Sequence, residues 1–166
     1  VSYSVKSNPN IALLRLIAER GAGADVVSGG ELFRSLKAGI LPEKIVYSGV
    51  GKTAEEIRYA LQSGISMLNV ESVAELHAIS DIAGELGTIA PIALRVNPDV
   101  DARTHAHTTT GKKENKFGIP YDDAVQVYKL AQELPHVRSI GIDVHLGSPI
   151  LTLEPYQEAL AKISTL

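Results

Sequence analysis

Short runs of β-branched and other apolar residues alternate with helical patterns along the whole chain, and this alternation constrains the fold more than any other feature. Most of the runs are continuously apolar, which is typical of parallel strands that are buried on both faces. The sequence therefore predicts an α/β protein built from repeated βα units. The predicted strands are residues 1–5, 25–27, 45–47, 67–70, 92–96 and 140–146.

Capping signals mark the helices between these strands. Asn8 is expected to cap the first helix, with Pro9 at its first position, and Gly21 follows its end. Thr53 and Ser72 each stand three residues before a glutamate, which is the pattern of a capping box. Further helices are predicted over residues 30–38, 121–134 and 153–166.

Repeated βα units form either a doubly wound sheet or a (β/α)8 TIM barrel. No Gly-x-Gly-x-x-Gly follows the first predicted strand, which argues against a dinucleotide-binding doubly wound fold and favours the barrel. About six of the eight units of a barrel are present, so we expect residues 1–166 to be one partial barrel domain with two open strand edges. The chain has no initiator Met and begins inside a predicted strand, so we expect a fragment of a longer protein.

Composition excludes several classes of protein. The net charge is −3 without a basic run, so a nucleic-acid partner is not expected. The chain has no cysteine, which excludes a disulfide framework and a thiolate zinc site. No apolar stretch approaches the roughly 20 residues of a membrane span, and no signal peptide is recognisable. We therefore expect a cytoplasmic protein without a membrane partner.

Polar residues stand at the carboxyl ends of the predicted strands, which in a barrel converge on one mouth. Among them, Lys6 closes the first strand, and a desolvated amine at that position is a nucleophile toward an aldehyde. A lone lysine there is more often solvated, so this interpretation depends on its neighbours. Arg95 lies in an apolar strand and needs a partner, for which Asp25 is the expected candidate. The whole set is Lys6, Asp25, Ser28, Ser48, Asn69, Glu71, Arg95, Asn97, Asp143, His145 and Ser148.

His145 is expected to end the last predicted strand, followed by Gly147 and Ser148. Its imidazole can stack on a planar ring, while glycine and serine at this position can approach a phosphate. Taken alone, a histidine in an apolar strand is more often a core residue. With Lys6 at another strand end, the binding interpretation is favoured.

The polar segment 97–118 has no helical period, and in a barrel it lies on the catalytic face or is simply a mobile loop. It contains His105 and His107 beside Asp99 and Asp101, but no third ligand is fixed in regular structure, so no metal site is expected. A serine hydrolase is also not expected, because no Gly-x-Ser-x-Gly elbow is present.

The chain resembles a known family in several blocks. Residues 3–8 (Tyr-Ser-Val-Lys-Ser-Asn) resemble the Tyr-Ala-Val-Lys-Ala-Asn signature of fold-type III pyridoxal-phosphate decarboxylases, and residues 24–32 match the next block of that family. Residues 95–102, 104–105 and 110–118 look like diaminopimelate decarboxylases specifically. The resemblance covers essentially the whole chain.

The resemblance implies a cofactor and roles for individual residues. The cofactor is pyridoxal 5'-phosphate, which Lys6 binds covalently, His145 contacts by stacking and Ser148 helps to hold by its phosphate. Asp25, Glu31 and Arg95 form the polar network around the lysine and the ring. Members of the family decarboxylate meso-2,6-diaminopimelate, a small amino acid, to L-lysine in lysine biosynthesis, and they usually act as homodimers.

The resemblance also predicts what residues 1–166 lack. A glycine-rich phosphate loop and a C-terminal β-domain of the family lie beyond the matching region, so we expect this chain alone to be inactive. Pro149 replaces the glutamine that the family usually has after His-x-Gly-Ser. Two alternatives remain open: a related amino-acid decarboxylase of the ornithine or arginine type, and a non-catalytic decarboxylase-like binding protein.

Overall fold

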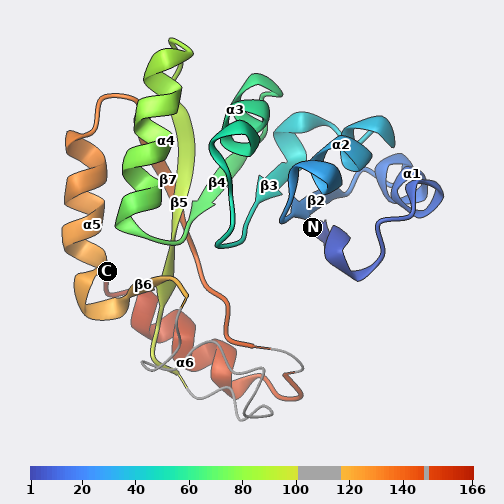
Figure 1. Cartoon of the computed structure of the whole chain (residues 1–166). Coiled ribbons are helices and arrows are strands. Elements are labelled where there is room, and N and C mark those ends of the chain that lie inside the picture. The colour runs from blue at the N-terminus through green and yellow to red at the C-terminus, as the bar shows by residue number, and fades with distance from the viewer. Residues whose placement is uncertain (101–116, 148–149) are drawn as a thin grey trace.

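Seven strands form one open parallel sheet in the part of the chain that the structure describes (Figure 1). The structure is a computed structural model, and it describes residues 1–100, 117–147 and 150–166. The strands are β1 (Ser2–Ser4), β2 (Gly23–Val26), β3 (Ile45–Tyr47), β4 (Met67–Val70), β5 (Ala90–Asn97), β6 (Ile119–Pro120) and β7 (Val137–Asp143).

The order of the strands settles the fold class. Neighbours in the sheet run β1-β2-β3-β4-β5, and β7 then pairs with β5 along the segment from Ala90 to Arg95, while β6 pairs with the last two residues of β5. A doubly wound sheet reverses its strand order at a switch point, and no reversal occurs between β1 and β5. The predicted incomplete barrel is therefore confirmed, with β1 and β7 at opposite edges of the described sheet.

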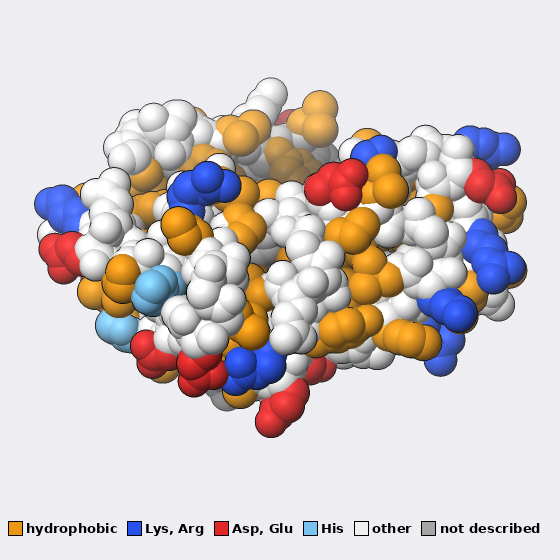
Figure 2. Space-filling view, turned by 90° about the horizontal axis from the view of Figure 1, so that it is seen from above, with side chains coloured by type: hydrophobic (Ala, Val, Ile, Leu, Met, Phe, Trp, Pro, Cys, Tyr) orange, Lys and Arg blue, Asp and Glu red, His pale blue; other side chains and the backbone are white. Residues whose placement is uncertain are grey.

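Helices α1 to α5 lie along one side of the curved sheet, and α6 lies beyond the carboxyl end of β5 (Figure 1). Seen from above, charged side chains surround hydrophobic ones that are scattered across the face (Figure 2). No helix of the described residues is long and apolar enough to cross a membrane. The helices are α1 (Ile11–Glu19), α2 (Gly29–Lys37), α3 (Ala54–Gln62), α4 (Val73–Glu85), α5 (Tyr121–Glu133) and α6 (Glu154–Ile163), with short 3-10 helices η1 (Val5–Ser7) and η2 (Pro42–Lys44).

Three predicted boundaries are wrong in ways that affect the site. Asn10, not Asn8, caps α1 through a bond from the amide of Ala12, because the helix begins only at Ile11 and the Asn8 side chain accepts from the amide of Asn10 instead. β1 ends at Ser4, so Lys6 lies in η1. β7 ends at Asp143, so His145 follows the strand by two residues and does not end it.

The capping boxes differ from each other. Thr53 and Glu56 form the complete reciprocal pair that the sequence predicts for α3. At α4 the Ser72 hydroxyl accepts from the amide of Glu75, as expected, but the Glu75 carboxylate accepts from the amide of Glu71. Both oxygens of that carboxylate are engaged elsewhere, because Oε1 also accepts from the ammonium group of Lys52.

The core lies between the sheet and the helices. Successive strand residues point to opposite faces, so every second side chain faces the helices. Along the middle strands these positions are fully buried apolar residues, among them Val26, Tyr47, Leu68 and Leu94. Their sequence neighbours point to the other face and include polar residues, among them Asp25, Ser48, Asn69 and Arg95. This alternation directs these side chains into one pocket.

Candidate functional site

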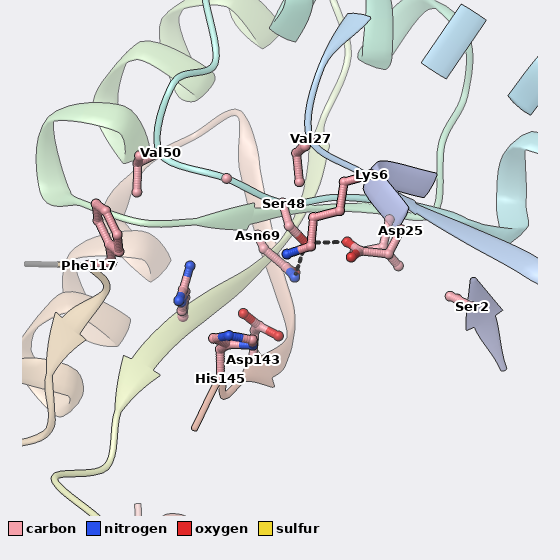
Figure 3. A pocket seen from close by; sticks show the side chains of 13 residues that line it. Ser2, Lys6, Asp25, Val27, Ser48, Val50, Asn69, Phe117, Asp143 and His145 are labelled. Atoms are coloured by element: carbon pink, nitrogen blue, oxygen red, sulfur yellow. Dashed lines mark hydrogen bonds between the residues drawn. The ribbon is translucent and has the colours of Figure 1, made fainter. Parts of the chain in front are cut away.

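A pocket of about 460 Å³ lies at the carboxyl ends of the strands (Figure 3). This volume falls in the range of roughly 300–1,000 Å³ that is usual for small-molecule sites. Each strand from β1 to β5, together with β7 or the residues just after it, contributes to the wall. The lining residues are Ser2, Lys6, Asp25, Val27, Val46, Ser48, Gly49, Val50, Asn69, Arg95, Phe117, Asp143 and His145.

Lys6 enters the pocket from η1, directly after β1 (Figure 3). Its neighbour Val5 is fully buried and anchors the turn. Lys6 itself is exposed, so the expected desolvation is not found in this chain. The reason is topological: β1 is the edge strand of an open sheet, and no described strand covers its outer side.

A chain of hydrogen bonds joins polar side chains at or just after the ends of β1 to β4. The Ser48 hydroxyl donates to Oδ1 of Asp25 at 2.6 Å, and Ser4 donates to Oδ2 at 3.3 Å. The Asn69 amide nitrogen donates to the Ser48 oxygen at 3.1 Å (Figure 3). Asn69 Oδ1 is buried and has no hydrogen-bond partner among the described residues. Most buried acceptors have a hydrogen-bond partner, so this oxygen is available to a donor from a ligand or from water.

Arg95 is paired with Glu71, and the predicted pair with Asp25 is wrong. One guanidinium nitrogen lies 2.8 and 2.9 Å from the two Glu71 oxygens, and the side chains are 13% and 3% exposed. Glu71 directly follows β4, the neighbour of β5, whereas Asp25 lies on β2, with two strands between it and Arg95. The guanidinium group also lies 6.0 Å from the centre of the Phe117 ring, within cation–π range.

Asp143 and His145 lie beside this pair, on β7 and just after it. Asp143 is in register with Arg95 on the neighbouring strand. Burial raises the pKa of Asp143, and the charge of Arg95 partly opposes that rise. Burial lowers the pKa of His145, and the positive charges of Arg95 and Lys6 lower it further. The pocket therefore favours the neutral imidazole.

Other predicted site residues lie elsewhere. The Glu31 carboxylate accepts from the amide of Val27 at 2.9 Å at the start of α2, and Glu31 is not among the lining residues. Its contact with the cofactor stays a prediction. Ser28 caps α2, and Asn97 is buried at the end of β5. Ser148 and Pro149 lie outside the described residues.

Metal coordination has no support in the described ranges. No group of three or more His, Cys, Asp or Glu side chains among the described residues could hold a metal ion. Three of the weak candidates, Asp101, His105 and His107, lie outside those ranges, as does most of the polar segment 97–118.

The sequence did not single out two contributors to the site. Gly49 lines the pocket with a φ of 96°, a left-handed conformation that favours glycine. Lys52 lies behind the wall with its side chain 1% exposed. Both residues stand in the short connection between a predicted strand and a capping box. Glycine and lysine in such a connection are the signal that could have pointed to Gly49 and Lys52.

The lining fits a cofactor with an aldehyde, a planar ring and ionisable groups. Lys6 supplies an amine, His145 a flat uncharged ring and Arg95 a fixed positive charge. The orphan oxygen of Asn69 is an acceptor for a bound donor. These groups are compatible with the aldehyde and the ring of a pyridoxal compound.

Comparison with known proteins agrees with this chemistry. Residues 1–166 match the family described as "Pyridoxal-dependent decarboxylase, pyridoxal binding domain". The chain is 52% identical over 163 residues to diaminopimelate decarboxylase of Pseudomonas aeruginosa, covering 98% of the chain and 39% of that protein. The corresponding enzyme of Aquifex aeolicus is 50% identical over 166 residues, covering all of this chain and 40% of its own length.

A solved structure agrees as well. Diaminopimelate decarboxylase from Helicobacter pylori, complexed with L-lysine, superposes with a TM-score of 0.96 at 46% identity, covering 99% of this chain and 42% of that one. The chain thus spans about two fifths of the length of these relatives. With its whole length matched, it belongs to the pyridoxal-binding domain family of the pyridoxal-dependent decarboxylases.

Proposed function

We propose that residues 1–166 form the amino-terminal part of the barrel domain of a diaminopimelate decarboxylase. This carboxy-lyase converts meso-2,6-diaminopimelate to L-lysine and carbon dioxide with pyridoxal phosphate. The observation that carries the proposal is the convergence of Lys6, Arg95, Asp143 and His145 on one pocket, in a chain similar along its whole length to enzymes of that name. The Helicobacter pylori relative was crystallised with L-lysine, the product of this reaction.

The residues of the chain prepare the pocket for this chemistry. When bound, pyridoxal phosphate supplies an electron sink for the electron pair that remains when carbon dioxide leaves. Lys6 supplies the amine that holds the cofactor's aldehyde. His145 presents a neutral ring, because burial and two nearby positive charges disfavour its protonation. Neutral histidine adds flat surface to the pocket without adding charge.

Fixed hydrogen bonds orient the charged groups. Asp25 is held from both sides by Ser4 and Ser48, so its carboxylate has little freedom to rotate. Arg95 is held by both oxygens of Glu71, which keeps its charge at the pocket wall. Such preorganisation means that the side chains need little rearrangement during the reaction.

Further parts of the proposal come from the sequence, most of them from its resemblance to the family. Glu31 belongs to the polar network near the lysine, and Ser148 helps to hold the cofactor's phosphate. The full-length protein is a homodimer in the cytoplasm and takes part in lysine biosynthesis. Size-exclusion chromatography with light scattering tests the assembly, and a monomer at micromolar concentration would contradict it.

The decisive experiment is borohydride reduction of the full-length protein with pyridoxal phosphate, followed by peptide mapping. We expect one pyridoxyl adduct, on Lys6. Lys6→Ala should remove the adduct, while Lys44→Ala, at an exposed lysine before β3, should leave it. Absence of any adduct would contradict the enzyme and favour a cofactor-free binding protein.

A substrate panel then tests the specificity of the full-length protein. Release of carbon dioxide from meso-diaminopimelate, L-ornithine and L-arginine is compared at equal enzyme concentration. We expect turnover of the first alone. Preference for ornithine or arginine would replace the proposal by a sister decarboxylase.

The partial barrel is a separate part of the proposal. The isolated 166 residues should form no lysine from diaminopimelate, because the matching relatives are about two and a half times as long. Lysine formation by the isolated chain would contradict this part alone.

A further inference from the structure

Lys52 is a buried cation that the proposed chemistry does not use. It lies between β3 and α3, and its side chain is 1% exposed. Its ammonium group donates to the Gly49 carbonyl at 2.6 Å, to the Asn69 carbonyl at 2.7 Å and to Oε1 of Glu75 at 2.6 Å. A lysine has three N–H donors, so all of them are engaged.

The acceptors of Lys52 belong to different parts of the fold. Gly49 follows β3 and Asn69 is in β4, and both line the pocket. Glu75 lies in the first turn of α4. Lys52 itself is not among the lining residues of the pocket. Lys52 therefore lies behind the pocket wall. Its hydrogen bonds connect the segment between β3 and α3 to β4 and to the beginning of α4.

A second set of hydrogen bonds connects Glu75, through Glu71, to Arg95. Glu75 Oε2 accepts from the amide of Glu71 at 3.0 Å, and Glu71 Oε1 accepts from the amide of Gly49 at 3.0 Å. Glu71 in turn holds the guanidinium group of Arg95. Both the amide and the carbonyl of Gly49 are therefore bound by this network, and the network ends on a charge that lines the pocket.

The charges of the network balance. Lys52 and Arg95 are positive, and Glu71 and Glu75 are negative. Without Lys52, two largely buried carboxylates would share one cation, and the Gly49 and Asn69 carbonyls would lose their donor. Buried charges without partners are strongly unfavourable, so the network has to rearrange.

We propose that Lys52 is a positioning residue that holds the Gly49–Asn69 wall of the pocket and, through Glu75 and Glu71, the guanidinium group of Arg95. Because Lys52 is not among the lining residues of the pocket, we expect it not to contact a bound cofactor or substrate. This inference rests on the proposed function, because it takes the pocket to be the cofactor site.

The test uses Lys52→Met in the full-length protein, with Lys44→Met as the matched control. Lys44 precedes β3 at its other end and donates one exposed hydrogen bond, to the Gly21 carbonyl. Hydrogen exchange is measured by mass spectrometry on peptides that contain the amides of Gly49 and Glu71. We expect both amides to exchange at least about tenfold faster in Lys52→Met and not in Lys44→Met, and unchanged exchange would overturn the proposal.

Steady-state kinetics give a second readout. A displacement of about 1 Å in a site costs on the order of 100-fold in rate, so kcat should fall about 10- to 100-fold in Lys52→Met. Labelling of Lys6 by pyridoxal phosphate and borohydride should persist, because Lys6 lies outside the network. A kcat within twofold of the parent would contradict the positioning role.

A double variant separates positioning from general stability. In Lys52→Met/Glu75→Met both charges are replaced by apolar groups, which often restores the stability lost when one partner is removed. The Gly49 and Asn69 carbonyls still lack the ammonium donor, and the Glu71 amide now also loses its acceptor. We therefore expect the double variant to unfold at a higher urea concentration than Lys52→Met does, but still to show fast exchange and low kcat. Recovery of slow exchange and of kcat would show a merely structural role and overturn the proposal.

The two proposals fail in different ways. If the protein does not decarboxylate diaminopimelate, neither parent nor variant shows turnover, but the exchange rates at Gly49 and Glu71 still decide the role of Lys52 in shaping the pocket. If the parent turns over and the variants keep both slow exchange and full rate, only the positioning proposal fails.

Discussion

One guanidinium nitrogen of Arg95 lies 2.8 and 2.9 Å from the two carboxylate oxygens of Glu71, and this pair joins the ends of β4 and β5 at the pocket. Both side chains are largely buried. The Gly49 amide donates to the same carboxylate, so Glu71 connects three successive strands of the sheet. A change at Glu71 is therefore expected to affect stability as well as the pocket.

Glu71→Gln should destabilise the protein by about 3 kcal/mol, because breaking a buried ion pair leaves the remaining charge without its partner. Urea unfolding of the full-length protein measures the change. The matched control is Arg58→Gln, which breaks a pair with Glu85 in which the two side chains are 39% and 60% exposed. That change should cost less than about 1 kcal/mol. If both variants lowered the free energy of unfolding equally, burial of the Arg95–Glu71 pair would not explain its contribution to stability.

Gly23→Ala should lower the free energy of unfolding of the protein by about 2–3 kcal/mol. A methyl group at Gly23 would lie 2.1 Å from the carbonyl oxygen of Lys44, and neither backbone can move without disturbing the pairing of β2 with β3. Thermal unfolding compares it with Gly51→Ala, where a methyl group meets nothing within 4 Å. The second change should be neutral or stabilise by up to about 1 kcal/mol. An unchanged melting temperature in Gly23→Ala would contradict the close approach of the Gly23 backbone to the Lys44 carbonyl.

His145 should make the protein less stable in mild acid. Its pKa is lowered in the folded state from the usual 6.5, so below that pH the unfolded chain binds more protons than the folded one. The free energy of unfolding therefore falls as the pH drops through 6.5, and the loss is complete once the pH is below the folded pKa.

Urea unfolding at several pH values checks this dependence. His145→Gln should show a smaller loss between neutral pH and pH 5 than the parent protein. His77→Gln, on the exposed side of α4, is the matched control and should behave as the parent does. An identical pH dependence in His145→Gln and the parent would contradict the lowered pKa.

Ser48→Ala should weaken binding of pyridoxal phosphate by about tenfold, because a hydrogen bond to a charged group contributes about 1.5–3 kcal/mol. The Ser48 hydroxyl donates to Asp25 and accepts from Asn69, so its loss leaves both side chains less well oriented. Fluorescence titration of the full-length apoprotein measures the affinity. Ser63→Ala, at the end of α3, serves as the control. Equal affinities in the two variants would argue against the role of Ser48.

The sheet could be predicted because buried parallel strands carry a strong local signal. The predicted runs at 45–47 and 67–70 coincide with β3 and β4. The end of β7 was misplaced because the apolar character continues through Val144 and Leu146 after the pairing with β5 has stopped. β6 has only two residues and gives no such signal.

The pocket could be predicted only in part. Strand ends converge in a barrel, so Lys6, Asp25, Arg95 and His145 could be grouped from the sequence alone. The partner of Arg95 depends on which strand lies beside β5, and that adjacency favours Glu71 over Asp25. Lys52 was missed because lysine is rarely buried, and its three acceptors become neighbours only in the folded sheet.

The strands stand in the sheet in nearly the order in which they occur along the chain, which has a consequence for biosynthesis. Lys6 leaves the ribosome early, whereas Asp143 and His145 follow only after nearly all of the described sheet has been made. At about 5–20 residues per second, this delay is on the order of ten seconds. During that interval the nascent chain carries Lys6, the proposed cofactor-binding amine, without the opposite wall of the pocket, so we expect cofactor capture only after residues 143–145 have been made.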